Sequence, residues 1–215
     1  MKVKICGITS LEDARAAVDA GADMLGFNFF IASPRFISPD NCARITAALN
    51  GSGVSLVGVF VNASVEEIRA VQQGCGLDLA QLSGDEPPEV VTMLSMLGVR
   101  VVKALRPADP AALEADLARF MPRQEAPAWL VDAYRPGEYG GTGQTADWSL
   151  AAGLAARAPI LLAGGLSPEN AAQAVRQVRP WGLDVASGVE SAPGKKDARR
   201  MAAFIQAARA GQSEK

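Results

Sequence analysis

The chain has 215 residues, of which 49% are hydrophobic and 6% aromatic, enough for one large α/β domain or two small ones. Its 21 Lys and Arg against 23 Asp and Glu give a net charge of −2, which argues against a nucleic-acid or membrane-surface partner. There is no histidine, and Cys6, Cys42 and Cys75 form neither a disulfide framework nor a CxxC zinc pattern, so we expect no metal site. With no signal-peptide pattern at the N-terminus and no apolar run long enough to span a bilayer, we expect a cytoplasmic protein.

Short, almost continuously apolar segments recur along the chain. Such runs are typical of strands that are covered on both faces. In chain order they are Val3–Cys6, Met24–Phe29, Leu56–Val61, Leu79–Leu82, Val99–Ala104, Ala128–Asp132, Ile160–Ala163 and Leu183–Ala186.

The segments between these runs carry helix signals. Ser10 to Asp13 has the spacing of a capping box, with Asp in the last position, and Ser64 to Glu67 has the same spacing with Glu. Ser38-Pro39 and Ser167-Pro168 each combine an N-cap serine with a proline suited to the first helical turn. Gly21 and Gly98 stand where helices should end.

This alternation, at roughly 25 residues per strand and helix, predicts a single (β/α)₈ TIM barrel over residues 1–210, followed by a polar tail, 211–215. The alternative is an open doubly wound sheet. A Rossmann sheet would carry GxGxxG after its first strand, and the segment from Cys6 to Thr9 is not that motif.

Cys6 draws attention because a chain without histidine must move protons with other groups. A cysteine in an apolar run is usually inert packing. In a barrel, however, functional groups gather at the carboxyl ends of the strands, and Cys6 ends the first strand. A free thiol is about one-tenth ionised at pH 7.5, so it can serve as a base at a cost of about 1.4 kcal/mol.

Glycine-rich turns follow the last two predicted strands: Gly164-Gly165 after the seventh and Ser187-Gly188 after the eighth. Such turns either serve tight chain reversal or bring backbone N–H groups close to an anion. Because both occur in the loops where barrels often bind phosphate, we favour a phosphate site.

Other polar residues at strand ends have two interpretations each. Arg35 either clamps a carboxylate or forms a surface ion pair. Asp132 is either a loop cap or a catalytic acid, and Asp184 either points to the barrel mouth or braces the last loop. Lys4 shares a strand face with Cys6 and should lie inside, in a structural or a catalytic role.

Several segments, in this order, resemble phosphoribosylanthranilate isomerase, an enzyme family of tryptophan biosynthesis. The resemblance covers essentially the whole chain, and the ordered set is far more specific than any one motif. The matching segments are Lys4–Thr9, Ser33–Arg35, Gly58–Asn62, Gln81-Leu82, Asp132-Ala133, Gly140–Gly143, Leu162–Leu166, Asp184–Glu190 and Pro193–Asp197.

The resemblance implies an Amadori rearrangement of N-(5-phosphoribosyl)anthranilate to 1-(2-carboxyphenylamino)-1-deoxyribulose 5-phosphate, without metal or cofactor, in a monomer or homodimer. It implies that Cys6 is the general base and Asp132 the general acid, which should then have a raised pKa when substrate is bound. It also implies the substrate contacts: Arg35 to the anthranilate carboxylate, Asp184 near the anthranilate nitrogen, Gln81 to the substrate, and the backbone of Gly164, Gly165, Ser187 and Gly188 to the phosphate.

Three positions depart from the family pattern: Ser83 replaces a usual histidine, Ala146 a usual aromatic and Ala186 a usual serine. Two other functions remain open. One is a different phosphosugar barrel, such as an enzyme of histidine or thiamine biosynthesis, and the other is a phosphate-binding barrel that regulates without catalysis.

Overall fold

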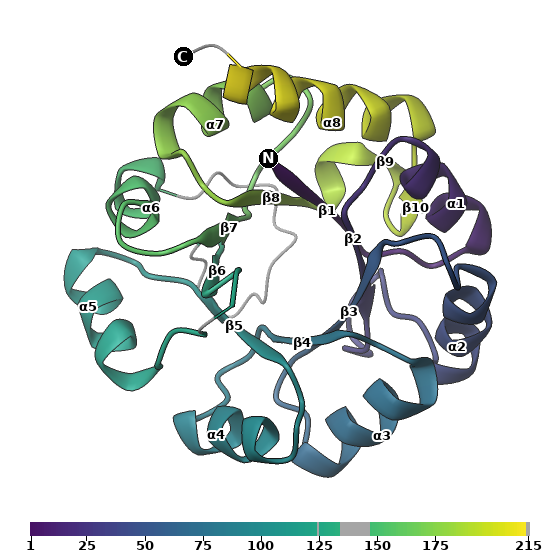
Figure 1. Cartoon of the computed structure of the whole chain (residues 1–215), viewed down its shortest axis with the longest axis horizontal. Helices are drawn as coiled ribbons and strands as arrows, with labels where there is room; N and C mark the ends of the chain where they lie inside the picture. The colour runs from purple at the N-terminus through teal and green to yellow at the C-terminus, as the bar shows by residue number, and fades with distance from the viewer. Residues whose placement is uncertain (124, 134–146, 214–215) are drawn as a thin grey trace.

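The computed structural model describes residues 1–123, 125–133 and 147–213. Within them, eight parallel strands close into a barrel in sequence order, with a helix after each strand (Figure 1). The closure joins β1 to both β2 and β8, so that Lys4 lies beside Met24 on one side and Asp184 on the other. The predicted (β/α)₈ barrel is therefore confirmed, and the open doubly wound sheet is excluded.

Each strand falls within a residue or two of a predicted apolar run. The strands are β1 (Lys2–Cys6), β2 (Met24–Asn28), β3 (Ser55–Phe60), β4 (Leu79–Leu82), β5 (Val101–Leu105), β6 (Trp129–Val131), β7 (Ile160–Leu162) and β8 (Gly182–Val185).

The helices form the outer ring. They are α1 (Leu11–Asp19), α2 (Pro39–Ala48), α3 (Val65–Cys75), α4 (Pro88–Met96), α5 (Pro110–Arg119), α6 (Trp148–Ala155), α7 (Ala171–Val178) and α8 (Ala198–Ser213). In the part of the chain that is described, none of them is long and apolar enough to cross a membrane.

Local capping explains where the helices begin. Ser10, Ser38 and Ser64 are the N-caps of α1, α2 and α3, and Ser64 forms a complete capping box with Glu67, as its spacing predicted. The seventh helix differs from the prediction. It starts at Ala171, after Asn170, because Ser167 opens a turn whose carbonyl accepts the N–H groups of Asn170 and Ala171.

Alternation of side chains divides the core into two layers. Inward-facing residues fill the barrel, among them Met24, Val57, Leu79, Val102, Leu130 and Leu161. The intervening residues, such as Val3, Ile5, Leu183 and Val185, pack outward against the helices. The barrel is thus a filled core.

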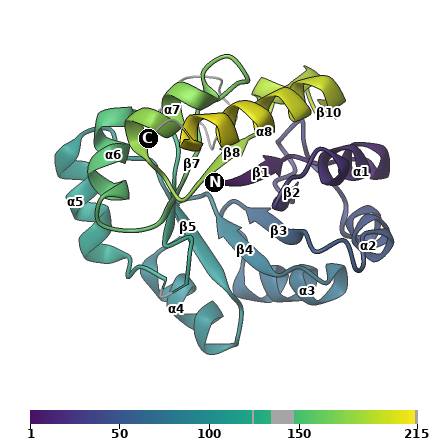
Figure 2. The ribbon, with the colours of Figure 1, turned by 45° about the horizontal axis from the view of Figure 1, so that its top comes forward.

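Two features at the end of the chain were not predicted. A short 3₁₀ helix, η1 (Ser187–Val189), leads into a two-stranded ribbon of β9 (Glu190–Ala192) and β10 (Lys195–Lys196), which lies outside the barrel near α1 (Figures 1 and 2). Helix α8 also includes Gly211 to Ser213, where we expected a polar tail. Gly211 is buried, with no room for a Cβ beside the carbonyl oxygen of Ala172 2.7 Å away, and Gln212 accepts a hydrogen bond from the N-terminal amine.

Candidate active site

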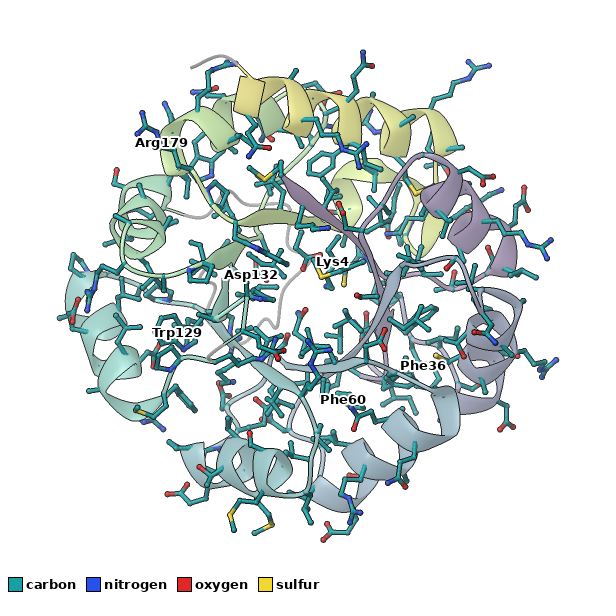
Figure 3. All side chains as sticks on the ribbon, viewed as in Figure 1. Lys4, Phe36, Phe60, Trp129, Asp132 and Arg179 are labelled. Carbon is teal, nitrogen blue, oxygen red and sulfur yellow. The ribbon has the colours of Figure 1, made fainter. Side chains whose placement is uncertain are left out.

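The residues predicted to carry chemistry meet at one end of the barrel, where its parallel strands terminate. Cys6 ends β1, Asp132 follows β6, and the glycine turns follow β7 and β8. Figure 3 shows the side chains of Lys4 and Asp132 in the central part of the barrel, from opposite walls, whereas Trp129 lies on the side of α5. The part of the loop after β6 that contains Gly140–Gly143 and Ala146 lies outside the described residues.

Cys6 is partly exposed at the mouth, and the neighbouring strand leaves room for its thiol. Its partner in the sheet register is Gly26, on β2. A Cβ at Gly26 would lie only 2.7 Å from the Cys6 sulfur and 3.1 Å from the Lys4 ammonium. A side chain at this position would therefore force the thiol to shift. Sequence reasoning missed Gly26 because one glycine inside a strand carries no distinctive signal.

Below the thiol, Lys4 and Asp184 form a buried ion pair. They are register partners on β1 and β8, and the ammonium of Lys4 lies 3.0 Å from each carboxylate oxygen. Burial lowers the pKa of Lys4, but Asp184 and Cys6 raise it by more, so Lys4 stays charged. Lys4 lies inside the barrel as predicted, and Asp184 is committed to this pair instead of bracing the last loop.

The thiol itself resists ionisation. Burial raises the pKa of Cys6 above 9.0; Lys4 opposes this rise, Asp184 adds to it, and Lys196 opposes it again. The unperturbed thiol assumed from sequence therefore understated how much the thiolate costs in this protein.

The pKa of Asp132 is raised, as a group that must donate a proton near neutral pH requires. Burial raises its pKa to about 6, against the lowering effect of the Ala133 N–H, which donates to Oδ1 over 2.7 Å. Asp184 raises this pKa further, while Arg106 and Lys4 lower it. A raised pKa was predicted for the substrate complex, and it is present in the protein without substrate. The same Lys4–Asp184 pair acts on both Cys6 and Asp132, which places the two groups at one site.

Arg35 is held in an ion pair, but not a surface one. Its Nε and Nη2 donate to the two carboxylate oxygens of Glu190 over 2.8 and 2.9 Å, and only 11% of its side chain is exposed. Lys196 donates to the same carboxylate over 2.8 Å. Burial raises the pKa of Glu190, but these two cations lower it by more, so the carboxylate stays ionised. The stem of Arg35 crosses Gly7, whose φ of +77° and missing Cβ accommodate it.

Gln81 points into the barrel from β4. Its Nε2 donates to the hydroxyl of Ser83 over 3.0 Å. Ser83, which replaces the family's usual histidine, is therefore a hydrogen-bond partner of Gln81. The side-chain oxygen of Gln81 is buried and has no hydrogen-bond partner among the described residues. A buried acceptor in this condition is costly unless a ligand or another segment satisfies it.

The two glycine turns pack against each other and against Asp132. Gly164 and Gly165 have φ values of +86° and +60°, and a Cβ on Gly164 would lie 3.1 Å from Asp132 Oδ1. A Cβ on Gly188 would overlap the carbonyl oxygen of Leu166 at 1.9 Å. The loops therefore approach as closely as bare backbone allows, as an anion site built from N–H groups needs.

Sequence reasoning did not single out Glu190 or Lys196, although both lie in segments that resemble the family. Their positions near the site depend on the β9–β10 ribbon, which is too short and polar to be read as strands. In the part of the chain that is described, no three His, Cys, Asp or Glu side chains are grouped so as to hold a metal ion.

Comparison with known proteins gives a consistent result. Residues 3–207 match the profile of the family described as N-(5'phosphoribosyl)anthranilate (PRA) isomerase. The chain is 48% identical over 214 residues to N-(5'-phosphoribosyl)anthranilate isomerase of Pelobacter propionicus, covering 100% of this chain and 98% of the relative.

Solved structures agree. Phosphoribosyl anthranilate isomerase from Thermotoga maritima superposes with a TM-score of 0.87 at 39% identity, over 98% of this chain and 99% of the other. A second structure, at TM-score 0.83 and 37% identity and with the same coverage, is described as this isomerase in complex with reduced 1-(o-carboxyphenylamino)-1-deoxyribulose 5-phosphate. The chain belongs to the N-(5'-phosphoribosyl)anthranilate isomerase family.

Proposed function

We propose that this enzyme converts N-(5'-phosphoribosyl)anthranilate to 1-(2-carboxyphenylamino)-1-deoxyribulose 5-phosphate by general acid and base catalysis, a step of tryptophan biosynthesis. The observation that carries the proposal is the meeting of the Cys6 thiol and the Asp132 carboxyl group around one buried ion pair, Lys4–Asp184. The relative solved with a reduced form of this product supports the same substrate class.

Asp132 acts first, by donating its proton to the ring oxygen of the ribose. The bond between C1 and that oxygen breaks as the anthranilate nitrogen forms a double bond to C1. At the ordinary carboxyl pKa of 3.8, about one molecule in 5,000 would carry this proton at pH 7.5, whereas a pKa of about 6 raises this to about one in 30. Raising the pKa therefore removes about 3 kcal/mol from the cost of providing the acid.

Cys6 then acts as the base, because its thiolate removes the proton from C2. The electrons of the C–H bond form a C1–C2 double bond, the charge on nitrogen is neutralised, and the resulting enol tautomerises to the ketone. Because burial raises the pKa of Cys6 as well, forming the thiolate adds to the cost of the reaction.

The two ends of the substrate would be held by groups on opposite sides of the mouth. The backbone N–H groups of Gly164, Gly165, Ser187 and Gly188 would bind the phosphate. Arg35 uses only one edge of its guanidinium on Glu190, and its other edge can bind the anthranilate carboxylate. For Gln81 and Asp184 we propose substrate contacts as well, Asp184 near the anthranilate nitrogen from within its pair with Lys4.

Replacement of Cys6 by serine tests the proposal. Turnover should be nearly abolished, while affinity for a product analogue stays within a few-fold, because only transition-state stabilisation is lost. The gene should restore growth of a tryptophan auxotroph that lacks this step, and Cys6→Ser should not. Full turnover in Cys6→Ser would remove the thiol from the mechanism, and analogue binding by the wild type without turnover would favour a non-catalytic barrel.

Arg35→Ala tests the substrate's orientation separately. KM should rise, and analogues that keep the carboxylate should be weakened more than analogues without it. Equal weakening of both kinds would place the carboxylate elsewhere. Sedimentation at several protein concentrations decides between the monomer and the homodimer.

A further inference from the structure

The β9–β10 ribbon brings a buried cation to the side of the active site where Cys6 lies. Of its two consecutive lysines, Lys195 is exposed, whereas the Lys196 side chain is completely buried. A buried ammonium is costly unless it is well paired, so its position should serve a purpose beyond solubility.

The contacts of Lys196 fix its ammonium beside the end of β1. The group donates to the carbonyl of Ala186 over 3.1 Å and to Glu190 over 2.8 Å. In the register of β1 and β8, Ile5 lies beside Val185, so the next residues, Cys6 and Ala186, leave the sheet side by side. The ammonium of Lys196 therefore binds the backbone carbonyl of the residue that lies beside Cys6.

The chain that follows Cys6 holds the ribbon in this position. The hydroxyl of Thr9 donates to the carbonyl of Gly194 over 2.6 Å, and the backbone N–H of Lys196 donates to Asp13 over 3.1 Å. The ribbon is thus tied to the loop after β1 and to α1, besides the contacts of the Lys196 ammonium.

The charges around the thiol do not cancel. Lys4 is matched by Asp184, so this pair is neutral. On the other side Glu190 is shared by Arg35 and Lys196, which leaves one excess positive charge. Across the barrel lie Asp132, which loses its charge as its proton is bound, and Arg106, which lowers the pKa of Asp132. Because the ribbon supplies both Glu190 and Lys196, the excess charge of this trio arises only together with Arg35.

We propose that Lys196 is a positioning residue that stabilises the thiolate of Cys6, so that the β9–β10 ribbon assists proton removal. The inference rests on the proposed function, in which Cys6 is the base. Lys196 exchanges no proton: the thiolate gains the proton of the substrate C–H bond, and the ammonium only favours the anion before that transfer. Its effect on the pKa of Cys6 is in the same direction as that of Lys4.

Lys196→Met is the decisive variant, and Lys195→Met is its matched control on the same strand. The alkylation rate of Cys6 by iodoacetamide, followed across pH by mass spectrometry of the Cys6 peptide, gives the thiol pKa without any substrate. We expect this pKa to rise by about one unit in Lys196→Met, equivalent to about ten-fold less thiolate, and to be unchanged in Lys195→Met. Lys196→Arg, which keeps the charge, should stay near the wild type.

Kinetics provide the second readout. At pH 7.5, kcat/KM of Lys196→Met should fall about ten-fold, and the difference from the wild type should narrow at a pH above both thiol pKa values, where each thiol is ionised. A purely structural role for Lys196 would lower kcat/KM equally at every pH. If Lys196→Met does not fold, Lys196→Gln provides the same neutral charge with a polar end that can still bind Ala186.

The outcomes separate the two proposals. A thiol pKa in Lys196→Met equal to that of the wild type overturns this inference, even if Cys6→Ser is inactive and the proposed function stands. Turnover retained in Cys6→Ser overturns the proposed base, whatever Lys196 does to the thiol. An equal rise of the thiol pKa in Lys195→Met would also contradict the inference, because it would reflect general surface charge.

Discussion

Replacing Asp132 by asparagine should make the protein more stable while removing its activity. Burial holds the pKa of this carboxyl group at about 6 in the folded chain, against 3.8 in the ordinary state. The native state therefore binds the proton more tightly than the unfolded chain does. The contribution of Asp132 to wild-type stability therefore falls as the pH rises from about 4 to about 6, and the loss is complete above about pH 7.

The expected size follows from this difference. A rise from 3.8 to about 6 corresponds to about 3 kcal/mol, and about 2–3 kcal/mol remains after allowance for solvent at this partly exposed group. Asparagine keeps an oxygen that can accept the Ala133 N–H, so the hydrogen bond need not be lost. In a chain of 215 residues the gain should raise the melting temperature by roughly 5–10 °C at pH 7.5.

Urea unfolding of both proteins between pH 4 and pH 8 measures the effect. The difference in unfolding free energy between Asp132→Asn and the wild type should be near zero at pH 4 and reach its full value by about pH 7. The other carboxyl groups are the same in both proteins, so their contributions cancel in this difference. A difference that does not depend on pH, or an asparagine variant less stable than the wild type at pH 7.5, would show that Asp132 is not held at a raised pKa. Such a result would also remove the physical basis of its role as the acid.

Three further substitutions test the geometry of the mouth and of the fold. Gly26→Ala places a Cβ 2.7 Å from the Cys6 sulfur, so kcat should fall at least ten-fold in steady-state assays while unfolding free energy drops by about 1–3 kcal/mol. Gly188→Ala overlaps a backbone carbonyl and should weaken inorganic phosphate as a competitive inhibitor, whereas Gly153→Ala, which meets nothing within 4 Å, should leave inhibition unchanged. Ser64→Ala removes the N-cap of α3 and should cost about 1 kcal/mol in urea unfolding with kcat intact. A wild-type kcat in Gly26→Ala, or equal inhibition of the Gly188 and Gly153 variants, would contradict these contacts.

The barrel could be predicted from sequence because its strands are buried on both faces. Their runs are almost continuously apolar, and serine caps and glycine ends mark several helices between them. The β9–β10 ribbon could not be predicted in this way, because its strands are two or three residues long and carry Glu and Lys. The start of α7 was misplaced because Ser167 forms a turn before the helix, a use of serine with the same local sequence as an N-cap.

At the active site, the locations of the functional residues could be predicted better than their hydrogen-bond and ion-pair partners. The ends of strands placed Cys6 and Asp132 at one mouth, since every parallel strand of a barrel ends there. The partner of Arg35 could not be inferred, because Glu190 is 155 residues away and the pairing depends on the path of the ribbon. The pKa of Cys6 also depends on burial and on three charged neighbours, and two of these, Asp184 and Lys196, are brought to the thiol only by the fold.

The shared carboxylate of Glu190 has a consequence for redesign of this barrel. Since Arg35 and Lys196 both donate to Oε1 of Glu190, removing one of the two cations changes how strongly the carboxylate binds the other. Substitutions at these two positions should be non-additive in a double-mutant cycle. An engineer who exchanges Arg35 to accept sugars without an aromatic acid would therefore disturb the proton-transfer side of the pocket as well. A change of substrate specificity would therefore require substitutions at Arg35 and in the β9–β10 ribbon to be chosen together.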